Sequence, residues 1–157
     1  GETFNLSISR PVILGIAIAP KRYSNELIRL TGEFVVNLPT ADIVRQVDAI
    51  GSVSGRQVDK FAMTGLTPVP ATVVRPPLIA ECPVNVECRL IRVESIGDHD
   101  LFQGEAVAQH VDEWALAEDG SIDPARLRAL AFQFGHYFAV TTLLGRRGIG
   151  RDLAPQP

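Results

Sequence analysis

The chain has 157 residues, a length at which one hydrophobic core can bury roughly 70% of the unfolded surface, and we expect a single domain. The formal net charge is −3, and the 15 basic residues are spread along the chain, so no basic stripe is available to neutralise a nucleic-acid backbone. The longest apolar run, residues 11–20, is under half the length of a membrane span, and no charged signal-peptide region precedes it. We therefore expect a soluble, cytoplasmic protein with no nucleic-acid or membrane partner.

Apolar residues make up 46% of the chain and charged residues only 21%, a balance that leaves apolar surface for a second subunit to cover. Cys82 and Cys88 fall in one predicted strand, where six residues span roughly 20 Å, so they are predicted to be free, buried thiols. The cysteines and histidines lack metal-ligand spacing, and no structural zinc is expected.

The first predicted elements are a strand and a helix. Residues 12–19 are continuously apolar and rich in β-branched side chains, a pattern typical of a strand that is buried on both faces. Ser24 can cap a following helix, and Gly32 is well placed to end it.

A second strand and two further helices follow. Residues 33–39 predict another buried strand, and Thr40 can cap a helix that stops at Gly51. Residues 57–65 can form about two helical turns, and residues 66–78, with four prolines, predict an irregular crossing segment.

The second half of the chain is predicted to be mostly β. In residues 82–95, apolar and polar residues alternate as in a strand. The apolar residues change to the other face near Leu90, which indicates a twist or bulge. Residues 97–100 predict a turn into the next strand, and residues 117–127 a turn with a short helical piece. Antiparallel strands with short inserted helices favour a closed or split β-barrel of the α+β class.

The nucleotide and hydrolase motifs with defined spacing are missing. Residues 145–150 lack the spacing of a dinucleotide fingerprint, and no Gly-rich loop ends in Gly-Lys-Ser/Thr. Residues 51–55 have Val53 where a nucleophile elbow needs serine.

Three polar clusters next to glycine are candidate sites. Arg22 and Ser24 fall at a helix start that can bind a phosphate, or Ser24 is a simple cap. Ser54 and Lys60 fall at a second helix start, where Lys60 can offer a point charge or remain a solvated lysine. His99 lies in the turn "GDHD", which needs no imidazole, and it is either a hydrogen-bonding group or a solvated histidine.

Four blocks in this order, "APKRYSNELIRLTGEFVVNLP", "GSVSGRQVDKFAMTGLTP", "PPLIAECPVNVECRL" and "GDHDLFQGEAV", closely resemble the flavin reductase-like family. The resemblance runs from about residue 3 to the end of the chain and implies one flavin reductase-like domain over residues 1–157. It implies an FMN-binding split β-barrel of Greek-key topology, mainly β with short inserted helices. It also implies a homodimer with one flavin near each side of the dimer interface.

The resemblance also implies a set of site residues. Ser24 matches a position that helps to hold FMN, Lys60 and His99 match positions that approach the flavin, and Phe132 matches an aromatic residue near the isoalloxazine ring. His99 is the predicted catalytic residue. Three further residues complete the predicted flavin site: Thr3, Arg22 and Ser54.

Relatives in this family usually open with one or two strands and a tryptophan-bearing segment before the point where this chain starts. Thr3 and Phe4 fall near the place of that tryptophan. The resemblance therefore predicts that N-terminal strands are missing from this sequence.

The function implied by the resemblance is an NAD(P)H-dependent flavin reductase with FMN, or FAD, that passes electrons to free flavin, ferric complexes or a redox partner protein. The chain offers no triad or carboxylate pair, which fits chemistry that the cofactor carries. An FMN-bound electron carrier without its own nicotinamide oxidation is the alternative. A third possibility is a barrel without flavin that serves as a dimeric binding module.

Overall fold

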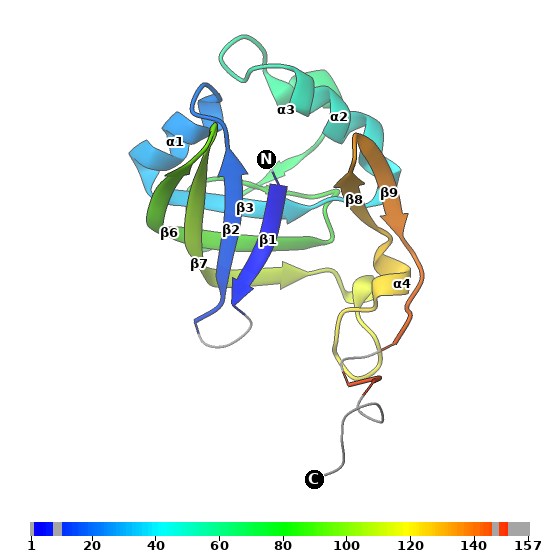
Figure 1. Cartoon of the computed structure of the whole chain (residues 1–157). Helices are drawn as coiled ribbons and strands as arrows, with labels where there is room; N and C mark the ends of the chain where they lie inside the picture. Colours follow the sequence, from blue (N-terminus) through cyan, green and yellow to red (C-terminus); the bar gives the residue numbers. More distant parts are fainter. Residues whose placement is uncertain (1, 8–10, 146–147, 151–157) are drawn as a thin grey trace.

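The computed structural model describes residues 2–7, 11–145 and 148–150, with only the backbone described for residues 2–7. Its largest sheet has five strands in the order β1-β2-β7-β6-β3, and every neighbouring pair is antiparallel (Figure 1). The strands are β1 (Glu2–Ser7), β2 (Ile13–Ile18), β3 (Glu33–Leu38), β6 (Val84–Ile96) and β7 (His99–Val111). No helix in the described part of the chain is long and apolar enough to cross a membrane.

Short helices and two small hairpins surround this sheet (Figure 1). The α-helices are α1 (Tyr23–Thr31), α2 (Val44–Ser52), α3 (Lys60–Thr64) and α4 (Pro124–Leu127), and the 3-10 helices are η1 (Ala41–Ile43) and η2 (Glu113–Ala115). The hairpins pair β4 (Pro68–Val69) with β5 (Leu78–Ile79), and β8 (Ala129–Gln133) with β9 (His136–Val140). The fold is therefore mainly β with short inserted helices, which confirms the predicted α+β class.

The core lies where α1 and three strands of the sheet meet. Ile28 of α1, Phe34 of β3, Cys88 of β6 and Phe102 of β7 are all buried there. Gly104 of β7 leaves room for the Phe34 ring, because a methyl group at residue 104 would come within 2.6 Å of Phe34 Cε1. The packing of the Phe34 ring against β7 therefore depends on a glycine.

The strands predicted at residues 12–19 and 33–39 are confirmed as β2 and β3, but the prediction that the first is buried on both faces is wrong. Only Gly15 of β2 is fully buried, and β3 alternates buried and half-buried residues at an end of the five-stranded sheet. An antiparallel sheet can pack one face on the core and leave the other nearer to solvent.

Two glycines end helices as predicted. Gly32 follows α1 with φ 69°, and its N–H donates to the Ile28 carbonyl at 2.8 Å. Gly65 follows α3 with φ 70°. Glycine adopts a positive φ without a Cβ clash, so a glycine directly after a helical pattern predicts where the helix ends.

The predicted helix caps are corrected by the structure. Ser24 is already the second residue of α1, and Arg22, with extended φ and ψ, occupies the cap position without a side-chain cap bond. Thr40 precedes η1 instead of α2 and also makes no side-chain cap bond. Gly51 does not stop α2, which runs to Ser52.

The long hairpin of β6 and β7 confirms several predictions. Its register shifts between Leu90 and Arg92, as the change of apolar face indicated. The chain turns at Gly97, with φ 61°, and Asp98. Cys88 in β6 is a free, buried thiol, and burial raises its pKa to about 12. Cys82 is also free and buried, with the same cause raising its pKa to about 12.

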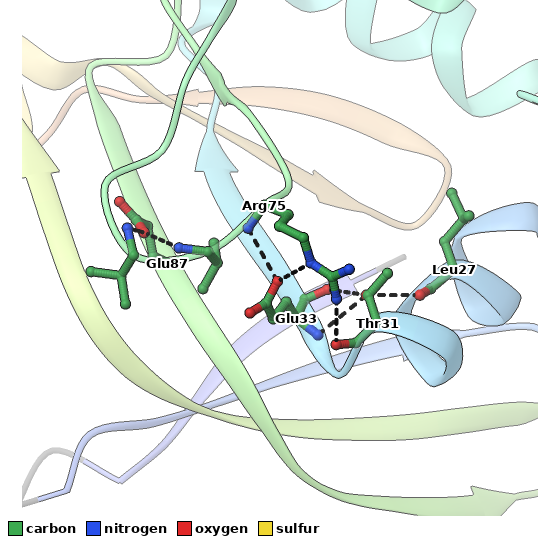
Figure 2. Close-up of polar contacts among 7 residues, drawn as sticks. Leu27, Thr31, Glu33, Arg75 and Glu87 are labelled. Carbon is green, nitrogen blue, oxygen red and sulfur yellow. Dashed lines mark hydrogen bonds and ion pairs between the residues drawn. The ribbon is translucent and has the colours of Figure 1, made fainter.

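Two carboxylates hold the irregular crossing segment against the sheet, and Figure 2 shows both. Glu87 of β6 accepts hydrogen bonds from the backbone N–H groups of residues 72–74 at 2.7–2.9 Å. Glu33 of β3 accepts from the Arg75 backbone at 3.1 Å and from its guanidinium Nε at 3.0 Å. The segment predicted to be irregular contains β4 and the first residue of β5, and the part between these two short strands is thereby fixed in place.

Candidate functional site

The candidate site is a hollow of about 550 Å³ at one end of the large sheet, next to the start of α1. Three segments line it. These are the end of β2, the connection into α1, and the tip of the β6–β7 hairpin, with the lining residues Ala17, Ile18, Ala19, Pro20, Lys21, Arg22, Asp98 and His99. Figure 1 shows α1 beside the end of this hairpin.

The first turn of α1 brings backbone donors and a cation to the hollow. Arg22 has φ −77° and ψ 138°, and no side-chain hydrogen bond caps the helix. The first N–H groups of a helix carry partial positive charge and favour an anion. Arg22 lines the hollow at this helix start, so this side of the site suits a phosphate or a similar group.

The tip of the hairpin brings an imidazole to the same hollow. His99 Nδ1 lies 2.8 Å from Asp98 Oδ1, and the His99 side chain is 46% exposed. The hydrogen bond and charge of His99, with a further contribution from Lys21, lower the pKa of Asp98. Because an ionised carboxylate only accepts hydrogen bonds, Nδ1 carries the proton in this pair. Nε2 is then an acceptor in the neutral imidazole and a donor in the imidazolium.

Lys60 is the first residue of α3 and lies close to the start of α1. Its Nζ donates to the Ile50 carbonyl at 2.6 Å, and burial together with the charge of Arg22 lowers its pKa. A methyl group at Gly55 would meet Tyr23 at 3.4 Å and the Lys60 side chain at 3.8 Å. The loop before α3 therefore packs against the first residue of α1 and brings Lys60 to it.

The second predicted helix entrance does not supply free backbone donors. Asp59 caps α3, and its carboxylate accepts from the N–H groups of Phe61 at 2.9 Å and Ala62 at 3.1 Å. Ser54 accepts instead from the Arg56 backbone at 3.3 Å. An anion in this region would therefore meet the Lys60 side chain and not the helix start.

Asp98 is the carboxylate that lines the hollow, where it pairs with His99 and feels the charge of Lys21. Within the described residues, the ion pairs include none of Lys21, Arg22 and Lys60. Like charges held together raise the local positive potential and attract anions. The structure thus places Arg22 and His99 at one hollow, and Lys60 close to the start of α1, from three separate parts of the sequence.

A family model described as "Flavin reductase like domain" matches residues 3–141 of the chain. The chain belongs to the flavin reductase-like family. An uncharacterised relative from Archaeoglobus fulgidus is 36% identical over 132 residues, which are 84% of this chain and 73% of the relative.

Solved structures in the same fold agree with this assignment. Flavoredoxin from Methanosarcina acetivorans matches with a TM-score of 0.87 and 27% identity over 97% of this chain and 81% of that one. An FMN-binding protein from Thermus thermophilus, solved with bound 1-cyclohex-2-enone, matches with a TM-score of 0.74 and 28% identity over 88% and 75%. The flavin reductase-like chain therefore has the split-barrel fold of its relatives, although its described sheets do not close on themselves.

Phe132 of this flavin reductase-like chain lies apart from the hollow. It is in β8 and packs on Tyr137 of β9, with ring centroids 4.9 Å apart. The Tyr137 hydroxyl donates to Asp48 of α2 at 3.1 Å, beside a second hollow of about 520 Å³. Within one chain, Phe132 and the cationic residue Arg22 therefore lie on different parts of the surface.

The remaining predicted residues have mixed positions. Ser24 is exposed on the first turn of α1, next to Arg22, and Ser54 is half-buried in the loop before α3. Thr3 pairs with Ile16 in the sheet, but its side chain lies outside the described part of the chain. The roles of these residues toward a flavin stay predictions.

Sequence reasoning missed the polar residues behind the hollow. Asp100 is buried and accepts hydrogen bonds from Asn25 and Arg29 of α1 and from Ser95 of β6. The pattern "GDHD" placed Asp100 in a turn, although it already belongs to β7. A signal was available, because a second aspartate after the turn has no role in the turn geometry.

Proposed function

We propose that this chain binds FMN, or FAD, and carries electrons from NAD(P)H through the flavin to free flavin, ferric complexes or a redox partner protein. The observation that supports this proposal most directly is that Arg22 and His99 line one hollow at the start of α1, with Lys60 close enough to Arg22 for its pKa to be lowered. An anion-binding helix start beside an imidazole suits a cofactor with a phosphate and a redox-active ring.

The residues present fit such a cofactor. The first turn of α1, with Arg22 and Ser24, would hold the phosphate, and Lys60 would add a further positive charge. Flavin, when bound, supplies the redox chemistry that the side chains lack. Contacts from Thr3, Ser54 and Phe132 belong to the same proposal as expected flavin contacts.

His99 is the proposed catalytic residue because its geometry lets it hold a proton at a defined atom. Asp98 keeps the Nδ1 hydrogen engaged at 2.8 Å, which leaves Nε2 as the group that accepts or donates. With about half of its side chain exposed, the imidazole can exchange that proton with solvent. Nearby positive charge from Arg22 and Lys60 would favour an electron-rich ligand.

The reductase is tested by mixing the FMN-loaded protein anaerobically with NADH and, separately, with NADPH while flavin absorbance is followed. Rapid bleaching with either nucleotide is the expected result. Flavin that stays oxidised with both nucleotides would contradict the reductase and support the alternative, an electron carrier, which the likeness to a flavoredoxin favours. Failure of the purified protein to take up FMN would contradict both.

We also propose that the chain forms one flavin reductase-like domain over residues 1–157 that works as a homodimer. Exposed apolar side chains on the β8–β9 hairpin support a contact with a second copy, among them Phe132, Phe134, Phe138 and Val140.

A further inference from the structure

One buried carboxylate connects the segments that line the hollow. Asp100, whose side chain is 5% exposed, accepts hydrogen bonds from Asn25 Nδ2 and from the Arg29 guanidinium, both at 2.8 Å and both on α1. It also accepts from the Ser95 hydroxyl at 2.6 Å, across the β6–β7 hairpin. The carboxylate therefore attaches α1 to the strand that begins with His99.

Asn25 extends the connection to the third segment. Its amide Nδ2 also donates to the Ile18 carbonyl, at 3.1 Å, at the end of β2. Its Oδ1 accepts from Arg29 Nε at 3.0 Å, which fixes the orientation of the amide. Asn25 is itself buried. The end of β2, the start of α1 and the hairpin tip thus share one hydrogen-bond network directly behind the hollow.

The Asp100 carboxylate at the centre of this network carries a negative charge. Hydrogen bonds from Ser95, Arg29 and Asn25 lower the pKa of Asp100 to about 2, so the carboxylate is ionised at physiological pH. Charge-assisted hydrogen bonds are stronger and more directional than neutral ones. Arg29 also lies over the Phe102 ring, 5.5 Å from its centroid, so the cation is packed against the core.

The two sides of the hollow depend on Asp100 to different extents. The hairpin tip is also held by backbone pairing, in which Ile96 is opposite His99 and Ser95 is opposite Asp100. The first turn of α1 has no backbone ladder to this hairpin, and its polar attachment passes through Asn25 and Arg29 to Asp100. Loss of the carboxylate should therefore displace α1 and leave the tip in place.

We propose that Asp100 is a positioning residue that sets the first turn of α1, with Arg22, at the distance from the hairpin tip that a flavin phosphate requires. This inference rests on the proposed function, because it assigns the phosphate of the flavin to the start of α1. It predicts a selective effect: Asp100 should matter for recognition of the phosphate and much less for recognition of the ring.

The test compares two ligands that share the isoalloxazine ring, FMN with its phosphate and riboflavin without it. For Asp100→Ala we expect the dissociation constant of FMN to rise about tenfold or more, because buried donors lose a charged acceptor and α1 loses its attachment. The dissociation constant of riboflavin should change by less than about threefold. Both are measured by flavin fluorescence titration of the full chain at fixed ionic strength.

Two variants control for a general effect on the fold. Glu33→Gln removes a carboxylate that binds Arg75 beyond the other end of α1, as Figure 2 shows, and both flavins should bind to it as to the unchanged chain. Ser95→Ala removes a contact of Asp100 that stays within the hairpin, so it should also keep the preference for FMN. Asn25→Ala removes the contact on the α1 side and should reduce that preference as Asp100→Ala does.

If Asp100→Ala does not fold, Asp100→Asn and Asn25→Ala provide the same comparison, since an asparagine oxygen can still accept from Asn25. Asp100→Asn should lose less of the preference for FMN than Asn25→Ala. An unchanged ratio of the two dissociation constants in these variants, with FMN bound normally by the unchanged chain, would overturn the inference and leave the proposed function intact. Absence of FMN binding by the unchanged chain would overturn both.

Discussion

For Lys60, the sequence predicted the position in the candidate site but not the surroundings of the side chain. Its position after "GRQVD" matched the resemblance, but its environment could not be predicted, because Arg22 lies 38 positions earlier in the chain. Burial and the charge of Arg22 lower the pKa of Lys60, and its Nζ donates to the Ile50 carbonyl at 2.6 Å. Two cations held side by side favour a bound anion between or beside them.

Replacement of Lys60 by methionine should therefore weaken FMN binding by about tenfold, since one phosphate-facing charge is lost. In the unchanged chain, FMN affinity should fall as pH rises through the lowered pKa of Lys60, because the ammonium loses its proton. Lys60→Met should remove this alkaline decrease. Fluorescence titration across pH measures both effects.

Arg45→Met is the matched control, because it removes one positive charge beside the other hollow. It should leave FMN affinity within about twofold at moderate salt. Equal losses in the two variants would indicate that net charge, and not a local contact, determines affinity.

At the level of elements, residues 66–78 were also predicted only in part. The prolines predicted an irregular segment over residues 66–78, which is correct except for the short strands β4 and β5. They did not predict which side chains hold the segment. Glu87 is fully buried and accepts from Thr72, Val73, Val74 and the His110 ring. Burial alone would raise the pKa of Glu87, but the hydrogen bonds from Thr72, His110 and Val73 outweigh it and lower the pKa to about 2.

Glu87→Gln should lower the free energy of unfolding by about 3 kcal/mol, because an amide cannot accept all of these bonds. The pKa of Glu87 in the folded state is below its usual 4.5, so its stabilisation is complete above about pH 5 and is lost as the pH falls toward 2. Glu87→Gln should remove that part of the acid dependence. Urea denaturation at several pH values measures both quantities.

Glu33→Gln is the control for this prediction because the Glu33 carboxylate binds Arg75 of the same segment nearer the surface. Its effect on the free energy of unfolding should be clearly smaller than that of Glu87→Gln, because solvent screens an exposed ion pair. A loss for Glu87→Gln no larger than this would show that the buried carboxylate does not hold the segment.

At the level of the whole molecule, the β8–β9 hairpin carries apolar side chains that the core does not use. Phe134 is 93% exposed at the turn with φ 53°, and Phe138 is about half exposed. Phe132 does not line the hollow that contains Arg22 and His99, and its contact with a flavin stays a prediction. A second copy is the partner that the high apolar content of the chain led us to expect.

Sedimentation equilibrium should give a mass near twice 17.0 kDa. Phe138→Ser should raise the dimer dissociation constant by at least about tenfold, because burial of an aromatic side chain contributes about 2 kcal/mol. Trp114→Ser, which removes a similarly exposed aromatic residue from η2, should leave the mass unchanged. A monomer mass for the unchanged chain would contradict the dimer.

The sequence alone determined the family, the mainly β class, the helix-ending glycines and the hairpin turn, because these depend on local periodicity, on backbone angles and on blocks of residues in order. It also identified Arg22, Lys60 and His99 as candidates. Only the tertiary structure decided that Arg22 and His99 line one hollow with Lys60 close to Arg22, and that Arg22 and not Ser24 occupies the cap position of α1. It also decided that Asp100 joins α1 to the hairpin behind the hollow. The physical reason is that burial and electrostatic contacts between distant residues depend on how the elements pack, which local patterns do not specify.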